Sequence, residues 1–209
     1  MVQELFYKNW LNEFDNLIHW SELDQFKKNN VSTHSYKVVL FTRLILEESF
    51  RSNSIAISNF KLQCNDHALF HDWDEIFTKR DLCHEFKYNE FNGFDIRKVV
   101  DDFVNFTVNK EIGTRSPSAY LINNSILKTN LSEGVEDIVK MADWLELIHH
   151  CMFERNLGNK IFGEKLKYCV DGFNGRYKKF CDNKQFIKDY GVSFSYSYLQ
   201  SIQTFLKVL

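Results

Sequence analysis

Apolar side chains recur every three or four positions along most of this chain, which is the spacing of an amphipathic α-helix. The pattern predicts helices at about residues 32–46, 60–73, 133–158, 3–18, 95–110, 160–182 and 194–207. Ser32 or Thr33 is expected to be the N-cap of the first of these helices. The chain has one proline, Pro117, where average usage predicts about ten. Because proline interrupts helices, its scarcity favours long, unbroken ones. We therefore predict an all-α fold.

Signals for strands and for domain boundaries are weak. The alternation in Val192–Tyr196 fits either a short strand or the entry to the last helix. There is no internal repeat and no linker, and the Gly113–Ser118 segment is predicted to be a loop. A single domain over residues 1–209 is the simplest interpretation.

Charge and cysteine content exclude several classes of protein. Lys and Arg number 26 against 28 Asp and Glu, a net charge of −2, so bulk charge does not favour a nucleic acid polymer or an anionic membrane. The five cysteines form no C-x-x-C pair, which predicts reduced thiols rather than a disulfide framework or a zinc ribbon. We see no signal peptide and no membrane-spanning apolar run, and we expect a cytoplasmic protein.

Three segments carry side chains of the kinds that bind metal ions. His34 lies at the start of a predicted helix, His71 and Asp72 are adjacent, and Asp143 lies within a strongly apolar helix. Burying an ionised carboxylate is costly unless it is paired or binds a cation. Two imidazoles and two carboxylates suit one divalent ion with open positions for water. An isolated His-Asp pair is also common as a hydrogen bond at a helix end, so spacing alone leaves both interpretations open.

The residues around these side chains form three motifs. They are Asn-Val-Ser-x-His-Ser at 30–35, Ala-Leu-Phe-His-Asp-x-x-Glu-x-x-Thr at 68–78, and Val-Lys-x-Ala-Asp-x-Leu-Glu at 139–146. In order, separation and helical setting they closely resemble the HD-domain phosphohydrolases, and among these the 5′-deoxynucleotidases of the YfbR type. The resemblance spans about residues 15–160. It implies one all-helical HD-domain bundle, with further C-terminal helices at 160–209.

The resemblance also implies a ligand set and a catalytic carboxylate. One divalent transition metal ion, with Zn, Co and Mn left open, would be held by the four side chains His34, His71, Asp72 and Asp143. Glu75 matches the family's catalytic carboxylate. It follows Asp72 by one helical turn, a position suited to orienting or deprotonating the attacking water.

The segment after Glu75 departs from the family pattern. Asp81 matches the acid of the family's Thr-Gly-Asp turn, which lies near the leaving oxygen. Here the turn reads Thr78-Lys79-Arg80-Asp81, without the glycine and with one residue more. Lys79 or Arg80 is therefore an alternative contact for a phosphate.

A second departure lies upstream, where His19-Trp20 takes the place of the family's Arg-Trp. By resemblance, Trp20 would pack on the sugar and select deoxyribose, and the alternative is that it belongs to the core. His19 lacks the permanent bidentate charge of an arginine. This leaves room for a longer phosphate chain held by other cations.

These features together predict metal-dependent hydrolysis of 2′-deoxynucleotides at the α-phosphorus. The main hypothesis is a 5′-deoxynucleotidase, which converts a dNMP into deoxynucleoside and phosphate. The alternatives are a dNTP triphosphohydrolase and, from another class, an inactive HD-fold nucleotide sensor or interaction module. The expected partners are a small-molecule deoxynucleotide and, by resemblance, further copies of the chain in a dimer or larger homo-oligomer.

Overall fold

The computed structural model describes residues 18–19, 25–26, 29–72 and 130–209. The chain divides into two compact units, which we describe separately. The first unit comprises Met1–Ser35 and Phe70–Asn130, and the second comprises Tyr36–Leu69 and Leu131–Leu209. The prediction of one domain over residues 1–209 stays a prediction.

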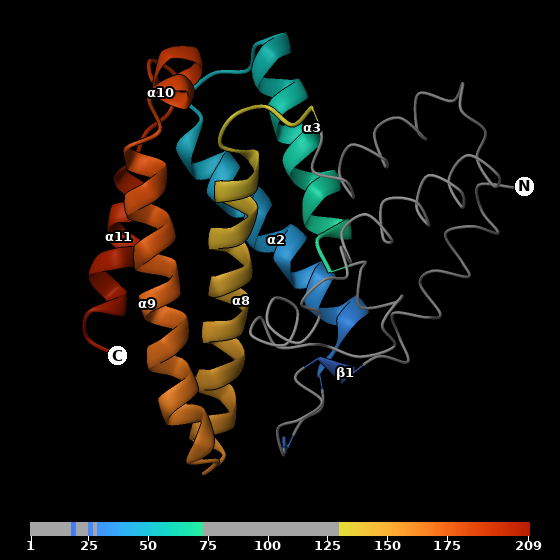
Figure 1. Ribbon diagram of the computed structural model, residues 1–209, viewed down its shortest axis with the longest axis vertical. Helices are drawn as coiled ribbons and strands as arrows, with labels where there is room; N and C mark the ends of the chain where they lie inside the picture. Colours follow the sequence, from blue (N-terminus) through green and yellow to red (C-terminus); the bar gives the residue numbers. More distant parts are fainter. Residues whose placement is uncertain (1–17, 20–24, 27–28, 73–129) are drawn as a thin grey trace, which may run out of the picture. The chain divides into compact units, whose positions relative to one another are not determined.

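The described residues are almost entirely helical, which confirms the all-α prediction (Figure 1). The helices are α2 (Val31–Ser49), α3 (Ile55–Phe70), α8 (Val135–Asn156), α9 (Ile161–Cys181), α10 (Lys184–Tyr190) and α11 (Ser197–Leu206). Two strands of two residues each, β1 (Ile18–His19) and β2 (Asn29–Asn30), pair antiparallel.

Five of the predicted helices match described ones, with shifts at their ends. The largest shift is in α3, which begins at Ile55 rather than near residue 60. The short helix α10 was not predicted, because seven residues are too few to show a helical period clearly. The predicted helices at 3–18 and 95–110 and the predicted loop at 113–118 lie almost wholly outside the described residues. Only position 18 is described, and it belongs to β1.

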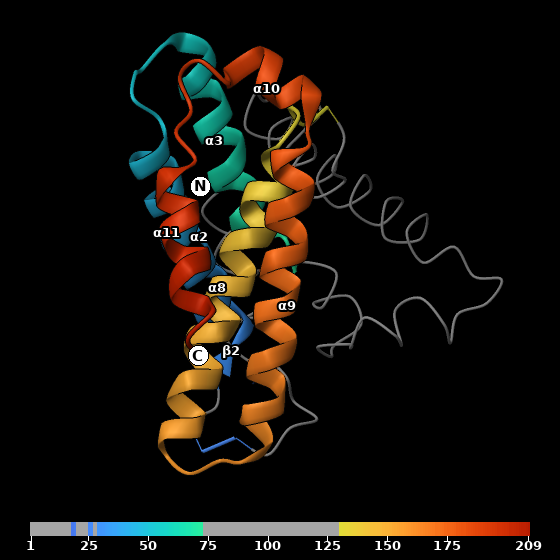
Figure 2. The ribbon, with the colours of Figure 1, turned by 90° about the vertical axis from the view of Figure 1, so that its left-hand side faces the viewer.

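In the second unit, α8 packs against both α2 and α9. Lys37 of α2 contacts Glu146 of α8, and Arg176 of α9 contacts Asp137 of α8. The pair α8 and α9 forms an antiparallel hairpin, and α11 lies against α9 (Figure 2). A Cβ on Gly172 of α9 would lie 2.5 Å from the Trp144 ring, so glycine is what permits this close approach of the two helices.

A cluster of aromatic rings closes one end of the second unit. Its members are Phe50, Phe60, Phe180, Phe186, Tyr190, Phe194 and Tyr196, and we call it the aromatic cluster. Phe186 is fully buried, and its ring centroid lies 4.6 Å from that of Phe180 and 5.1 Å from that of Phe194. Edge-to-face packing at such distances favours aromatic pairs beyond the area they bury.

The Val192–Tyr196 segment supplies part of this cluster. Phe194 forms an isolated antiparallel bridge with Phe50, and Ser195 N–H donates to the Ser49 carbonyl at 2.7 Å. The segment is therefore a single bridge followed by the entry to α11, so each of the two interpretations of its alternation is partly correct.

The described cysteines, Cys64, Cys151, Cys169 and Cys181, are free thiols, as predicted. Burial raises the pKa of the Cys64 thiol well above its usual value. Among the helices of the described ranges, none is long and apolar enough to cross a membrane.

Candidate metal centre

The first helical turn of α2 holds His34 in a fully buried position. The helix is capped by Asn30, whose side-chain Oδ1 accepts from the Thr33 N–H at 2.8 Å and from the Ser32 hydroxyl at 3.1 Å. We expected Ser32 or Thr33 to be the cap, and that expectation is wrong. Because asparagine is among the strongest N-caps, the helix begins earlier, at Val31, and His34 lies inside it rather than at its edge.

His71 and Asp72 lie in the turn that follows α3, which ends at Phe70. His71 is nearly buried, with 7% of its side chain exposed, and Asp72 shows 16%. The turn therefore presents an imidazole and a carboxylate side by side with limited access to solvent.

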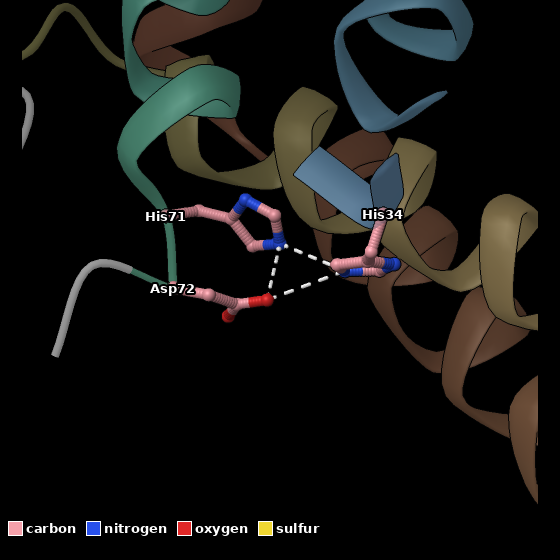
Figure 3. A group of neighbouring side chains, drawn as sticks. All are labelled: His34, His71 and Asp72. Carbon is pink, nitrogen blue, oxygen red and sulfur yellow. Dashed lines mark hydrogen bonds and ion pairs between the residues drawn. The ribbon is translucent and has the colours of Figure 1, made fainter. Parts of the chain in front are cut away.

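The three side chains of the first unit converge on one point (Figure 3). His34 Nε2 lies 3.2 Å from His71 Nε2 and 3.3 Å from Asp72 Oδ2, and His71 Nε2 lies 3.1 Å from the same oxygen. The two imidazole rings are tilted by 50°, so both present Nε2 to the centre. We call these residues the donor cluster.

The spacing of the donor cluster fits a bound transition metal ion. Ligand atoms about 2.1 Å from one ion, at angles between octahedral and tetrahedral, lie about 3.0–3.4 Å from one another. The three observed separations fall within this interval. Asp72 Oδ2 is buried and faces both imidazole nitrogens, so an ion bound there would meet this oxygen and both nitrogens together. The donor set of two imidazoles and a carboxylate is typical of such ions.

The electrostatics of the cluster keep Asp72 ionised. Burial alone would raise the pKa of this carboxyl group. The charge of His71, the hydrogen bonds from both imidazoles and the charge of His34 outweigh burial, and they hold the pKa of Asp72 well below its usual range. Asp72 is therefore available as an anionic ligand.

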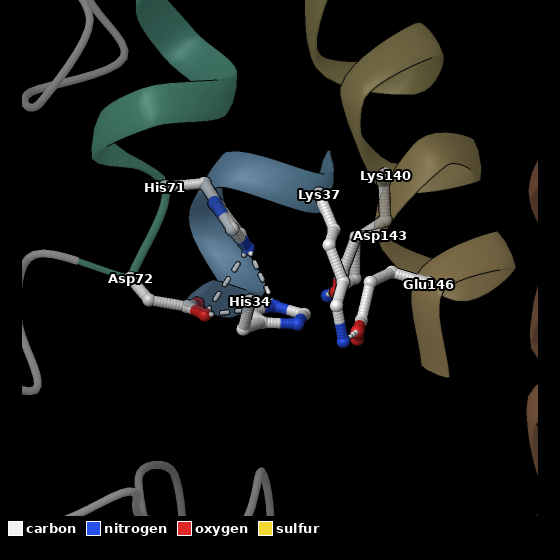
Figure 4. Close-up of polar contacts among 7 residues, drawn as sticks. All are labelled: His34, Lys37, His71, Asp72, Lys140, Asp143 and Glu146. Carbon is white, nitrogen blue, oxygen red and sulfur yellow. Dashed lines mark hydrogen bonds and ion pairs between the residues drawn. The ribbon is translucent and has the colours of Figure 1, made fainter. Parts of the chain in front are cut away.

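Asp143, the fourth predicted ligand, lies in α8 of the second unit. Its side chain is buried, with 5% exposed, and its Oδ2 accepts from Lys140 Nζ at 2.5 Å. One turn later, the fully buried Glu146 accepts from Lys37 Nζ at 2.9 Å (Figure 4). Sequence reasoning gave no role to Lys37 or Glu146. The available signal was the last residue of the third motif, a glutamate between two leucines and one helical turn after Asp143.

The remaining predicted site residues are not placed by the described part of the chain. Trp20, Glu75, Lys79, Arg80 and Asp81 all lie outside it. His19 belongs to β1, where its backbone pairs with Asn29. Their assigned roles stay predictions.

Comparisons with known proteins give one matching family and a similar solved structure. The model of a family described as 5′-deoxynucleotidase YfbR-like matches residues 6–189. Among solved structures, an HD-domain phosphohydrolase from Listeria innocua is similar, with a TM-score of 0.57 and 19% sequence identity over 87% of this chain and 83% of that one. At that identity the likeness shows a shared fold. No curated protein sequence matches the chain.

Proposed function

This chain belongs to the YfbR-like 5′-deoxynucleotidase family and is a hydrolase, and we propose that its substrates are 2′-deoxynucleoside 5′-monophosphates. In the proposed reaction the oxygen of a water molecule bonds to phosphorus as the bond between phosphorus and the 5′ oxygen breaks. The 5′ oxygen takes up a proton, and the products are a deoxynucleoside and inorganic phosphate. The observation that supports this most directly is the donor cluster, because hydrolases with the HD-domain fold depend on a metal ion.

We propose that His34, His71, Asp72 and Asp143 hold one divalent ion, with Zn, Co and Mn as the candidates. Such an ion, when bound, supplies a Lewis acid for the phosphate oxygens and lowers the pKa of a water molecule. Asp143 is suited to this role because it is an almost fully buried carboxylate that accepts from a lysine, a cation that an incoming ion can replace.

The catalytic and substrate-binding roles rest on the matched motifs. Glu75 is proposed to orient or deprotonate the attacking water, and Asp81 to lie near the leaving oxygen. Trp20 is proposed to pack on the sugar and exclude a 2′-hydroxyl. His19, Lys79 and Arg80 are proposed to contact the phosphate.

A specific sequence feature keeps the triphosphohydrolase alternative open. His19 replaces the family's arginine, while Lys79 and Arg80 add two cations near the altered turn. A dNTP carries more negative charge than a dNMP, so extra cations would favour it. Both reactions attack the α-phosphorus, and the metal ligands do not distinguish between them.

The test is a panel of ribo- and deoxyribonucleoside mono- and triphosphates, supplied with Mn²⁺, Co²⁺ or Zn²⁺. Free phosphate from dNMPs supports the proposal, whereas triphosphate from a dNTP supports the alternative. Nucleotide binding without turnover under any of the three metals would instead favour the inactive sensor. Asp72→Ala serves as the control for a contaminating phosphatase.

Substrate selection and assembly need separate measurements. Trp20→Ala is expected to relax the preference for deoxyribose, and unchanged rejection of ribonucleotides would refute that role. We also propose that the protein is a homo-oligomer, a dimer or larger, acting in the cytoplasm. Light scattering during size-exclusion chromatography tests the assembly, and a monomer at micromolar concentration would contradict it.

A further inference from the structure

A pocket lies between α9, α10 and α11, wholly within the second unit. Its volume is about 510 Å³, and among its lining residues are Tyr177, Cys181, Ile187, Val192, Tyr196 and Gln200. The helix α10 follows the C-terminal end of α9, and α11 lies against α9 (Figure 2). No lining residue belongs to the donor cluster, and the proposed reaction uses none of them. A pocket of this size admits an organic molecule.

The walls of the pocket are held by packing and hydrogen bonds outside it. The centroid of the Tyr196 ring lies 5.7 Å from that of Phe180 and 5.0 Å from that of Phe194, both in the aromatic cluster. The Phe194 N–H donates to the Tyr190 carbonyl at 3.0 Å, which fixes the turn between α10 and α11. Binding a ligand here would therefore require little ordering of the protein.

Two polar side chains of the lining indicate a ligand with hydrogen-bonding groups. The Tyr196 hydroxyl is buried and has no hydrogen-bond partner among the described residues. A buried hydroxyl in that state costs free energy, which a ligand that supplied the partner would recover. Gln200, exposed on α11, adds an amide with two donors and an acceptor at the same pocket.

The lining of the pocket carries no charge. No Lys, Arg, His, Asp or Glu is among the described residues that form it. Burial raises the pKa of the Cys181 thiol and of the Tyr196 hydroxyl, and it raises the pKa of Tyr177 to about 12, so all three groups are neutral at neutral pH. A phosphate group here would lose water without gaining a cation, whereas the tyrosine rings can pack against an aromatic ring. The pocket therefore favours an uncharged aromatic ligand.

We infer that this pocket is a second binding site, which takes the uncharged deoxynucleoside released by the proposed reaction. A deoxynucleoside carries an aromatic base with hydrogen-bond donors and acceptors, and it lacks the phosphate for which the pocket has no partner. The inference rests on the proposed function, because that reaction is the source of the deoxynucleoside.

The test observes the pocket directly by methyl NMR of the metal-free, full-length protein. Val192 is fully exposed and Ile187 partly so, and both line the pocket, so their methyl resonances report a ligand there. The resonances are identified by their loss in Ile187→Leu and Val192→Ala. Titration with deoxyadenosine, deoxyguanosine, deoxycytidine and thymidine is expected to give saturable shifts with at least one of them. The matching 5′-monophosphates are expected to bind at this site about tenfold more weakly.

The chain offers matched variants for the polar contacts. Tyr196→Phe and Gln200→Ala are each expected to weaken the deoxynucleoside affinity about fivefold, the effect of one neutral hydrogen bond. Tyr196→Phe is expected to fold at least as stably as the parent, because it removes a buried hydroxyl without a partner. Tyr190→Phe and Gln203→Ala make the same changes outside the lining and are expected to leave the affinity within about twofold. Trp20→Ala, at the proposed substrate site, is expected to leave these shifts unchanged.

Several results would overturn the inference. It fails if no deoxynucleoside shifts the Ile187 and Val192 methyl resonances, or if the monophosphates bind there as tightly as the nucleosides. It fails also if Tyr196→Phe and Gln200→Ala both behave like their controls, or if octanol binds with equal affinity, because the site is then merely apolar. The proposed function fails by a different measurement, the absence of phosphate release from every dNMP. Deoxynucleoside binding in a protein without that activity would leave the pocket standing and remove the proposed reaction.

Discussion

The donor cluster and the aromatic cluster differ in the chemistry of their side chains. In the donor cluster, three groups that can carry charge lie within 3.3 Å of one another. In the aromatic cluster, Phe60, Phe180 and Phe186 are fully buried, and their rings meet at tilted or edge-to-face angles. A cation bound between its members would stabilise the donor cluster, whereas the exclusion of water stabilises the aromatic cluster. We therefore expect chemistry to depend on one cluster and folding stability on the other.

The two clusters also differ in whether their members can repel one another. Two imidazole nitrogens 3.2 Å apart repel each other once both rings are protonated, and only Asp72 opposes this among the three. Phenylalanine rings carry no charge, so no such repulsion arises in the aromatic cluster. Changes in the donor cluster should therefore alter ion binding far more than folding, and changes in the aromatic cluster should do the reverse.

The largest expected effect is that of Asp72→Asn on activity. The substitution keeps the size of the side chain and removes its negative charge. The loss of an anionic ligand is expected to cost several kcal/mol of catalysis, or about a thousandfold in kcat/KM. Phosphate release from a dNMP measures this, and circular dichroism checks that the helices persist. Activity within about tenfold of the parent would contradict the ligand role.

Phe186→Ala tests the aromatic cluster, and it is expected to lower folding stability without changing ion binding. Removing a fully buried ring that packs against Phe60, Phe180 and Phe194 is expected to lower the unfolding free energy by about 3–5 kcal/mol. Urea denaturation of the metal-free protein measures the loss, and Phe186→Leu is the milder control. Co²⁺ affinity below the unfolding transition is expected to stay unchanged. A parallel loss of affinity would show that the two clusters are not independent.

Metal binding should raise stability through the proposed ligands and not through the aromatic cluster. An ion that binds only the folded chain adds about 2.7 kcal/mol to the unfolding free energy at a hundred times its Kd. The same increment is expected in Phe186→Leu, and none in Asp72→Asn. Thermal melts with and without Co²⁺ measure it. An equal increment in the parent protein and Asp72→Asn would place the ion elsewhere in the chain.

Much of the helical structure could be predicted from the sequence, because its cause is local. The period of apolar residues gives the long helices α2, α8 and α9 to within a few residues at each end. The start of α2 differs from the prediction because Asn30, rather than Ser32 or Thr33, caps the helix. The helix α10 could not be predicted, because its seven residues are too few to show a helical period.

Three of the predicted ligands form the donor cluster, whereas the partners of nearby buried carboxylates could not be predicted from the sequence. His34, His71 and Asp72 were predicted from motifs, and their convergence needed the fold of two distant segments. The partners of the buried carboxylates, Lys37 for Glu146 and Arg176 for Asp137, lie on other helices. Such pairs depend on tertiary packing, and a single sequence carries no periodic signal for them.

The smallest expected effect is that of a substitution at Gly134. This change perturbs the packing of the aromatic cluster without removing a ring, so it tests how tightly that cluster is packed. Gly134 precedes α8 with a φ of 90°, and a Cβ there would lie 2.5 Å from the Phe186 ring. Gly134→Ala therefore combines backbone strain with overpacking and is expected to cost about 1–3 kcal/mol. Gly163→Ala is the matched control, since that position lies in α9 with open space around it. There alanine is expected to stabilise the protein by about 0.5–1 kcal/mol through helix propensity. Urea midpoints measure both changes. If Gly134→Ala were neutral, the aromatic cluster would be loosely packed at this end, and its assigned part in stability would have to be reduced.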